Sequence, residues 1–453
     1  MSNKKLYNLA ITTISMAISP FEERYKTEMN SIFEEENKLR KWMDVEIALA
    51  KAHAGMKTIP KDAVEKIAGG AKKVKLERVN EIEAEIHHDL MAMVRALSEQ
   101  AGDAGKYVHL GATSYDIEDT ATALIFLDAI ALLEKHLSGF AEVLRSIAIK
   151  HKKTVCIGRT HGQHAVPTTY GLKFAIYYQE CLRNLERLHE AKKRIGVGKM
   201  SGATGTMATF LGSGGKIQTL VMKNLGLKPA PASNQVIQRD RHAEVMFVLA
   251  LIAAMLEKIA KEIRNLQRTE ILEVSEPFGA KQVGSSTMPQ KRNPHKSERV
   301  CSIARLVRAN VQTALENIPL EHERDLTNSA NERAIFSESF IATDYMLGEM
   351  TKILGGLEFF EDNIKKNLEL TKGLIMAERL MIFLVSKKSY GRQEAHEIVR
   401  QLAQEAFRQK IHLKEMVKRS KIGIIMRDSE LDEIFNPETY IGEAERIADE
   451  ASK

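Results

Sequence analysis

Two long stretches of this chain lack the residues that normally end a helix. Between about Ile117 and Lys153 there is no proline and the only glycine is Gly139, and between about Val236 and Glu273 there is neither. Both residues are poorly tolerated inside helices. A helix of about 35 residues would be about 50 Å long at 1.5 Å per residue. Such helices exceed those of ordinary globular domains and predict a long bundle.

The composition supports an all-α fold. The 453 residues include only 10 prolines and 27 glycines, aromatic residues make up 6%, and helix-forming residues such as Ala, Leu, Glu and Lys are abundant. Apolar periodicity and the spacing of helix breakers predict further helices. They cover residues 35–54, 84–102, 297–317 and 329–354. We place the last domain boundary near residue 360, because shorter helices follow it.

Charge and cysteine usage exclude several classes of protein. The formal charge of +6 is spread along the chain, which disfavours a nucleic-acid binder and suits a small anionic ligand. The three cysteines are far apart and show no CxxC spacing, so a disulfide framework or zinc site is not expected and a reducing compartment is. The apolar run at 245–256 is shorter than the roughly 20 residues that span a bilayer, and it predicts a buried helix segment.

The N-terminus carries a weak likeness to a secretion signal. Two lysines precede an apolar stretch, but Asn8, Thr12, Thr13 and Ser15 interrupt it and no A-x-A cleavage site follows. We therefore expect a cytoplasmic protein. Whether Met1 or Met16 is the native start stays open.

Five polar stretches fall at the ends or breaks of the predicted helices, and each has a purely structural alternative. Thr113 or Ser114 could N-cap the helix that follows, with Asp116 and Glu118 in its first turn. The glycine-rich segment 196–216 lacks the spacing of a phosphate loop, so we interpret it as a flexible or tightly turned connection. The five stretches are 87–89, 108–120, 158–164, 234–242 and 284–298.

Two of these stretches suggest charge or metal chemistry. His161 and His164 lie three residues apart, but no carboxylate partner stands at helical spacing, so a metal site is not indicated. The sequence RDRH at 239–242 could be a solvated helix face with the capacity to bind an anion.

The stretch GSSTMPQKRNPHKSE at 284–298 has no amphipathic period. Gly284 and the serines supply exposed N–H groups, Lys291 supplies positive charge and Asn293 supplies amide donors. Pro294 suits a position just inside the start of the following helix. This composition predicts a loop that wraps an anion and closes over it.

This stretch resembles the signature of the fumarase/aspartase superfamily, whose pattern G-S-S-x-M-P-x-K-x-N-P it satisfies at every fixed position. From about Pro20 to its end the chain resembles the adenylosuccinate lyase family within it. The matching segments include HHDLMA, HLGATSYDIEDTA, GRTHGQHAVPTT, NQVIQRDRHAE and EHERDLTNSANER.

The resemblance implies an all-α, three-domain fold with a central long-helix bundle. The N-terminal helical domain would cover residues 1–111, with 1–19 outside the resemblance, the bundle 112–360 and the C-terminal domain 361–453. It implies a homotetramer in which three subunits build each active site, and no cofactor or metal. The implied substrates are adenylosuccinate and SAICAR, the succinyl-carboxamide ribotide of purine biosynthesis, and each would lose fumarate by β-elimination.

The resemblance also implies catalytic roles. A β-elimination needs a base for the C–H proton, a cation for the succinyl carboxylate and an acid for the leaving nitrogen. Ser285 matches the base and His161 the acid. Glu298 matches the partner of that histidine, while Lys291 and Asn293 match residues that hold the carboxylate.

The remaining matches are substrate contacts. Thr113 and Ser114 match contacts to the succinyl carboxylate, which outweighs capping alone and is compatible with it. Arginines suit the nucleotide phosphate because their planar fork donates two hydrogen bonds. Asn234 replaces a hydroxyl residue common in the family, and the doubled histidine at 87–88 leaves its register open. The full set of contacts is Arg24, Tyr25, His88, Asp89, His109, Thr113, Ser114, Thr160, Gln235, Asn293, Arg299, Arg324, Ser329 and Arg333.

Two other functions stay open at this point. One is a different lyase of the superfamily, such as argininosuccinate lyase. The other is a non-catalytic structural relative, which the intact set Ser285, His161, Lys291 and Glu298 disfavours. An RNA-binding module is disfavoured by the dispersed charge.

Overall fold

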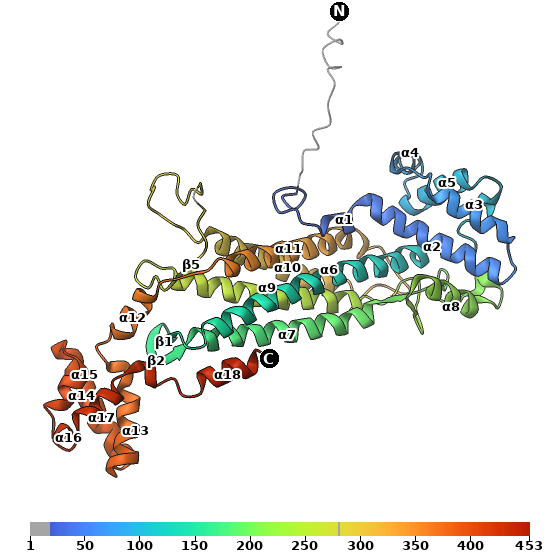
Figure 1. Ribbon diagram of the computed structural model, residues 1–453. Coiled ribbons are helices and arrows are strands. Elements are labelled where there is room, and N and C mark those ends of the chain that lie inside the picture. The colour runs from blue at the N-terminus through green and yellow to red at the C-terminus, as the bar shows by residue number, and fades with distance from the viewer. Residues whose placement is uncertain (1–18, 280) are drawn as a thin grey trace, which may run out of the picture. The chain divides into compact units, whose positions relative to one another are not determined.

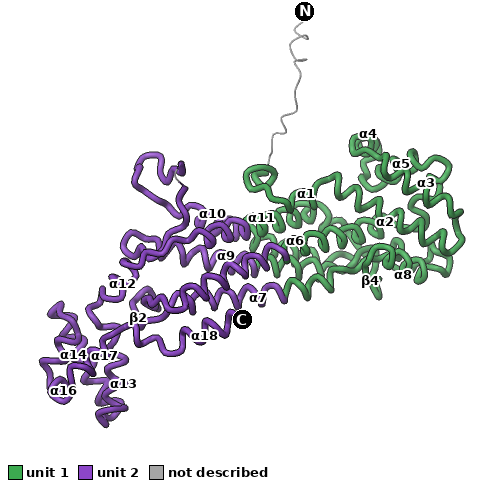
Figure 2. Tube along the Cα trace, in the orientation of Figure 1, with its two compact units in different colours: residues 1–134, 187–250, 305–345 green, residues 135–186, 251–304, 346–453 purple. Residues whose placement is uncertain are grey.

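The computed structural model describes residues 19–279 and 281–453. The chain divides into two compact units (Figure 2). Unit 1 comprises the residues up to Glu134 with 187–250 and 305–345, and unit 2 comprises 135–186, 251–304 and 346–453. The possible signal sequence and the alternative start at Met16 lie outside the described residues. The division into three domains at residues 111 and 360 stays a prediction.

Five long helices contain the boundaries between the units and contribute residues to both (Figure 1). The longest has 37 residues, which confirms the long helix expected from the missing breakers. The helix expected over 236–273 is shorter than predicted, at 27 residues, and is followed by turns. These helices are α6 (Ser114–Lys150), α7 (Tyr170–Ile195), α9 (Asp240–Leu266), α10 (His295–Glu316) and α11 (Ser329–Gly355).

Unit 1 adds short helices to its share of the long ones. Strands β3 and β4 form a small parallel pair. The elements are α1 (Asn30–Phe33), α2 (Glu35–Gly55), α3 (Lys61–Ala71), α4 (Leu76–Ile86), α5 (Asp89–Ala101), η1 (Gly102–Tyr107), β3 (Val197–Gly198), η2 (Ala208–Phe210), α8 (Gly214–Leu225) and β4 (Lys228–Pro229).

The core of unit 1 is apolar and continuous from α2 to α8. Leu39, Met43 and Leu49 of α2 are almost fully buried with Leu90 and Met93 of α5. Between α6 and α11, the Phe126 ring packs edge-on against Phe336 and Phe340, with ring centroids 5.0 and 5.2 Å apart. Burial of such aliphatic and aromatic side chains is the main source of folding free energy.

Unit 2 combines the other parts of the long helices with a β-hairpin and a set of short helices. Strands β1 and β2 pair antiparallel with a register shift between Ile157 and Arg159. The elements are β1 (Val155–Thr160), β2 (Gln163–Thr169), β5 (Val274–Ser275), β6 (Glu358–Phe359), α12 (Glu361–Glu369), η3 (Leu374–Met376), α13 (Ala377–Lys388), α14 (Arg392–Gln409), α15 (Leu413–Lys418), α16 (Lys421–Ile424), α17 (Asp428–Ile434), η4 (Pro437–Thr439) and α18 (Ala444–Ala451).

A second apolar core lies in unit 2. Leu380 and Leu384 of α13 are fully buried and belong to one cluster with Leu413 and Val417 of α15. Ile157 of the hairpin joins this cluster. A polar contact links α6 to α7 in this unit, where the Cys181 thiol donates to the Leu137 carbonyl. The three cysteines are free and buried.

One helix expected from the sequence was wrong. The helix expected over 84–102 is split, because His87 adopts a left-handed backbone conformation (φ 53°) that ends α4 before α5 begins. The segment 196–216 is tightly turned, as expected, with left-handed backbone at Gly202, Gly205 and Gly212, and it also contains β3, η2 and the start of α8. The hairpin and α7 were not predicted. Gly102 does end α5, as expected.

The apolar run 245–256 is a segment of α9, as expected, and most of its side chains are buried. Phe247 is 53% exposed, and Ala254 is exposed as well. Among the described residues no helix has the length and apolar character needed to cross a membrane.

Candidate active site

A pocket of about 380 Å³ in unit 1 collects six of the predicted site residues. Three helices present their N-termini there, since α5 begins at Asp89, α6 at Ser114 and α11 at Ser329. The first backbone N–H groups of a helix carry partial positive charge and attract anions. The lining residues are Glu83, His87, His88, Asp89, Ser114, Tyr115, Glu118, Arg324, Leu326, Ser329 and Arg333.

Arg324 is the strongest candidate for an anion ligand in this pocket. Its Nη1 donates to the Gln235 Oε1 at 3.0 Å, and its Cζ lies 3.8 Å from the centre of the Tyr115 ring. Its Nε and Nη2 are buried and have no hydrogen-bond partner among the described residues. Buried donors without partners are costly, so they mark a place where a ligand oxygen would be stabilised.

Arg333 lies among carboxyl groups in this pocket. Arg333 forms an ion pair with Asp89. Burial opposes ionisation of Asp89, but the hydrogen bond and charge of Arg333 outweigh it and lower its pKa. Burial, together with the nearby charges of Asp89 and Asp119, raises the pKa of Glu118 to about 7. Among the carboxyl groups that line the pocket, Asp89 is therefore firmly ionised and Glu118 titrates near neutral pH.

The loop 108–113 beside this pocket is held at nearly every residue. The Glu46 carboxylate accepts from both the backbone N–H and the Nδ1 of His109. The Leu110 carbonyl pairs with the His53 Nε2 at 2.9 Å, and the Gly111 carbonyl accepts from the Thr209 hydroxyl at 2.6 Å. His109 itself has a left-handed backbone (φ 62°) that these contacts stabilise.

Asp116 organises the start of α6. Its carboxylate accepts from the backbone N–H groups of Thr113, Ser201 and Gly202, and it pairs with the ammonium of Lys199. The side chains of Asp116 and Lys199 are fully buried. The helix is therefore capped by Asp116 and not by a hydroxyl, which corrects the capping alternative. The hydroxyls of Thr113 and Ser114 have no hydrogen bond to other described residues.

Arg24 and Tyr25 do not line this pocket. They lie in the turns before α1, where the Tyr25 ring contacts Tyr345 with centroids 5.0 Å apart. The Arg24 guanidinium lies 5.9 Å from the centre of the Tyr25 ring.

In unit 2, His161 occupies the turn of the β1–β2 hairpin. Its backbone is left-handed (φ 54°), its side chain is exposed, and Thr160 ends β1 directly before it. His164 follows in β2, and burial together with the charge of Arg159 lowers its pKa. Within residues 19–279 and 281–453 no group of three or more His, Cys, Asp and Glu side chains is arranged to hold a metal ion.

Glu273 anchors the base of this hairpin. Its buried carboxylate pairs with Arg159 of β1 and accepts from the hydroxyl of Tyr170 at 2.5 Å and from the amide of Asn367 at 2.9 Å. Three elements, β1, α7 and α12, are thereby tied to one carboxylate. Arg159 stands two residues before His161, so the network fixes the strand that carries the histidine.

The signature loop is held at its base and exposed along its tip. Residues 286–292 are exposed. The Ser285 Oγ accepts from the backbone N–H of Met288 at 3.1 Å and of Thr287 at 3.3 Å. The Asn293 amide donates to the Gly284 carbonyl at 2.8 Å and closes the base of the loop.

The segment that leaves the signature loop enters α10 through a buried cap. The Glu276 carboxylate accepts from the backbone N–H groups of Lys296 and Ser297. Pro294 stands immediately before α10, and its carbonyl accepts the helical hydrogen bond from the Glu298 N–H at 3.0 Å. Pro294 is thus one position earlier than predicted. Glu298 is exposed in the first turn of α10, and Arg299 lies 3.8 Å from Glu349.

Within each unit the structure therefore joins some of the predicted residues and not others. Gln235 reaches the pocket through Arg324, and Thr113 adjoins Ser114. Among the described residues, no hydrogen bond or ion pair links His161 to Glu298, or Lys291 to Ser285.

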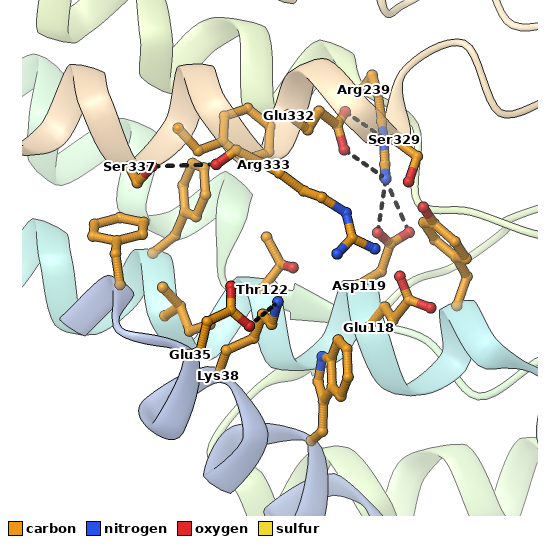
Figure 3. Close-up of a pocket in the computed structure, with 16 residues that line it drawn as sticks. Glu35, Lys38, Glu118, Asp119, Thr122, Arg239, Ser329, Glu332, Arg333 and Ser337 are labelled. Carbon is orange, nitrogen blue, oxygen red and sulfur yellow. Dashed lines mark hydrogen bonds and ion pairs between the residues drawn. The ribbon is translucent and has the colours of Figure 1, made fainter. Parts of the chain in front are cut away.

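A second cavity of about 230 Å³ in unit 1 shares Tyr115, Glu118, Ser329 and Arg333 with the first (Figure 3). On its wall, Arg239 pairs with both Asp119 and Glu332. Arg239 is only 2% exposed, so the sequence RDRH is not the solvated face that we expected. Its charge is already compensated by two carboxylates.

Comparison with known proteins identifies the family. Residues 23–309 match a family model described as Lyase, and residues 373–451 match one described as Adenylosuccinate lyase C-terminus. Adenylosuccinate lyase of Pyrococcus abyssi is 57% identical over 438 residues, which cover 96% of this chain and 97% of the relative. That of Methanocaldococcus jannaschii is 51% identical, with coverage of 97% and 96%.

The chain belongs to the adenylosuccinate lyase family.

The fold agrees with this assignment. The solved structure of a fumarate lyase from Mesorhizobium sp. BNC1 superposes with a TM-score of 0.87 at 31% identity, covering 94% of this chain and 97% of that one. The all-α fold predicted for a member of the adenylosuccinate lyase family, and the enzyme class, are therefore confirmed.

Sequence reasoning missed three residues that shape the candidate site of this family member. Glu118 lines the pocket, Glu46 holds His109, and Glu273 holds the hairpin. Glu46 carried a signal, because it is a carboxylate among the mostly apolar residues of the helical pattern 35–54. Glu118 was noted only as an acidic residue of the first turn.

Proposed function

We propose that this chain is a cytoplasmic lyase that cleaves adenylosuccinate to AMP and fumarate, and SAICAR to its carboxamide and fumarate. The observation that carries the proposal is the pocket of unit 1, where three helix N-termini meet Arg324 and Arg333. Such a pocket suits a substrate with several anionic groups. Membership of the adenylosuccinate lyase family supports the same substrates.

The nucleotide would bind at the arginine side of this pocket. The unpartnered Nε and Nη2 of Arg324 form a planar fork that matches two phosphate oxygens. Ser329 and the first N–H groups of α11 would add neutral donors. Arg333 would exchange its contact with Asp89 for the substrate, or share it. Arg24, Tyr25 and Arg299 would complete the nucleotide contacts, as the family resemblance implies.

The succinyl group would bind near the start of α6. The hydroxyls of Thr113 and Ser114 have no competing partner and lie at a helix N-terminus, where a carboxylate is favoured. Lys291 and Asn293 would supply the cation and the amide for this carboxylate. Because charge grows on the carboxylate as the C–H proton leaves, these donors would stabilise the transition state more than the bound substrate.

Ser285 would remove the proton. A serine hydroxyl is a weak base, and its alkoxide must be stabilised. The two backbone N–H groups that point at its Oγ do so, since they favour negative charge on that oxygen. The C–H electron pair would then form the double bond of fumarate as the C–N bond breaks.

His161 would protonate the leaving nitrogen. Histidine is the side chain best suited to donate a proton near neutral pH. Glu298 would orient the ring and favour the imidazolium. The remaining contacts to the substrate would come from His88, Asp89, His109, Thr160 and Gln235.

The active enzyme would be a homotetramer in which three subunits share each site. Large apolar side chains are exposed on the long helices, which supports an interface there. Ile176 of α7, Phe247 of α9 and Leu306 of α10 are each more than half exposed. Mixed tetramers of Ser285→Ala and His161→Ala should regain part of the activity. No recovery in confirmed mixed tetramers would contradict shared sites.

Turnover of the purified chain tests the function. Adenylosuccinate, argininosuccinate, aspartate and malate would be assayed separately without added metal. Release of AMP and fumarate from adenylosuccinate alone is the expected result. Cleavage of another of these substrates would overturn the assignment of the arginines, and no turnover by the folded tetramer would favour a non-catalytic relative.

A further inference from the structure

His109 and Glu46 form an isolated pair in unit 1. Both oxygens of the Glu46 carboxylate are used by the same residue, since Oε1 lies 2.7 Å from the His109 Nδ1 and Oε2 accepts from the His109 backbone N–H at 2.9 Å. Glu46 stands within α2, and its side chain is 1% exposed. The described residues offer this carboxylate no other hydrogen bond.

This geometry fixes the tautomer of the histidine. A carboxylate that accepts at Nδ1 requires a proton there, so Nδ1–H is the donor. The Nε2 atom is left as the free end of the ring, with no hydrogen-bond partner among the described residues. The His109 side chain is 13% exposed, and its loop leads directly to Thr113 and Ser114.

The charged groups around the ring favour its protonated form. Burial opposes protonation of His109, but the hydrogen bond and charge of Glu46, with a smaller contribution from Asp116 of α6, outweigh it and raise the pKa. Lys199 faces Asp116 and is paired with it. His53, on α2, is kept neutral by burial, which lowers its pKa.

We propose that Glu46 is a positioning residue which holds His109 as a cation, and that the Nε2–H of His109 donates to an anionic oxygen of the substrate. This inference rests on the proposed function, because it takes the ligand to be a succinylated nucleotide. The oxygen belongs either to the phosphate or to the succinyl carboxylate, and the products AMP and fumarate separate these sources.

The test compares Glu46→Gln with wild type in the full-length enzyme, measuring kcat and KM for adenylosuccinate from about pH 6 to about pH 9. The amide keeps the shape and one acceptor but removes the negative charge. We expect the ratio of variant to wild-type KM to rise with pH, because the ring of the variant loses its proton before the wild-type ring does. The ratio should reach about tenfold, which corresponds to the loss of one charge-assisted hydrogen bond. The kcat should change little.

A matched control is Asp44→Asn, which removes one negative charge from an exposed position on the same helix. It should leave KM unchanged at every pH. A KM ratio for Glu46→Gln that does not depend on pH would overturn the proposal, because a purely structural role predicts loss of stability or of kcat without that dependence.

Product inhibition identifies the anionic group. Weaker inhibition of Glu46→Gln by AMP, with unchanged inhibition by fumarate, would indicate the phosphate, and the reverse would indicate the carboxylate. Unchanged inhibition by both would overturn the proposal.

Two further measurements apply if Glu46→Gln does not fold or if the wild-type enzyme is inactive. If Glu46→Gln does not fold, His109→Gln keeps a donor toward Glu46 but cannot carry charge. Its KM ratio to wild type should fall as the pH rises and the wild-type ring loses its proton, and a constant ratio would overturn the proposal. If wild type does not cleave adenylosuccinate, the proposed function fails. Calorimetric binding of AMP and of fumarate then decides, since equal affinity of wild type and Glu46→Gln for both ligands would overturn the role of Glu46.

Discussion

The loop 108–114 of unit 1 and the signature loop 284–293 of unit 2 are built in opposite ways. The first is fixed from outside itself, by Glu46, His53, Thr209 and Asp116. The tip of the second is exposed, and the hydrogen bonds of Ser285 lie within the loop. The difference teaches that the proposed substrate contacts of the first loop are held in place by the fold, whereas the proposed base stands on an exposed segment.

The sharpest test of this contrast is Ser285→Ala. The side chain contributes only two hydrogen bonds within an exposed loop, so stability should be unchanged, while turnover should fall at least about 1000-fold because the proton acceptor is lost. Thermal unfolding and kcat would be measured together. The neighbouring Ser286→Ala is the matched control and should remain active. Near-normal turnover by Ser285→Ala would refute the assignment of the base.

A change in the loop 108–114 should have the opposite effect, since it should lower stability. Asp116→Ala removes the partner of the fully buried Lys199 and the acceptor for three backbone N–H groups. We expect a loss of about 3–5 kcal/mol in the free energy of unfolding, as for other broken buried pairs. Urea unfolding would measure it. The control is Asp128→Ala, which also lies on α6. It breaks a more exposed ion pair, with Lys41 of α2, and should cost at most about 1 kcal/mol. Equal losses would remove the contrast between the loops.

Arg324→Ala should affect binding more than stability. Its buried Nε and Nη2 have no hydrogen-bond partner to lose, so the folded state loses mainly the contacts with Gln235 and with the Tyr115 ring. The KM for adenylosuccinate should rise about 30- to 100-fold, which corresponds to about 2–3 kcal/mol for charge-assisted hydrogen bonds to phosphate. Steady-state kinetics would measure it, with Gln235→Ala expected to have a smaller effect. An unchanged KM would place the phosphate elsewhere.

The smallest expected effect concerns Glu118. Its pKa is raised to about 7, so the folded protein binds this proton more tightly than the unfolded chain does. Glu118 therefore lowers stability progressively as the pH rises from about 4.5 to about 7. Glu118→Gln should raise the free energy of unfolding by about 1–2 kcal/mol at pH 8 and leave it unchanged near pH 4. Unfolding curves at both values would check this, and an equal effect at both would exclude the raised pKa.

Much of the fold could be predicted because it depends on short-range patterns. The absence of helix breakers after Ile117 gave α6 within about three residues at each end. The signature loop was recognisable because its residues form one contiguous string. The β1–β2 hairpin was missed, since strand formation depends on packing, here against other residues of unit 2 such as the cluster that contains Ile157.

The candidate site was only partly predictable. Its residue types came from the resemblance, but the contacts of Glu46 and Glu273 did not, because each joins positions about 60 to 115 residues apart. No periodicity or local spacing marks such partners.

The sequence by itself determined that this chain folds into long helices and carries the signature motif of the superfamily, because helix propensity, breakers and a contiguous motif are local properties. Only the tertiary structure decided which side chains are already paired and which remain open to a ligand. Asp116 takes over the cap of α6 and leaves the hydroxyls of Thr113 and Ser114 unbonded, while Arg324 is buried with donors to spare. Pairing and burial depend on segments brought together by packing, so they exist only in the folded chain.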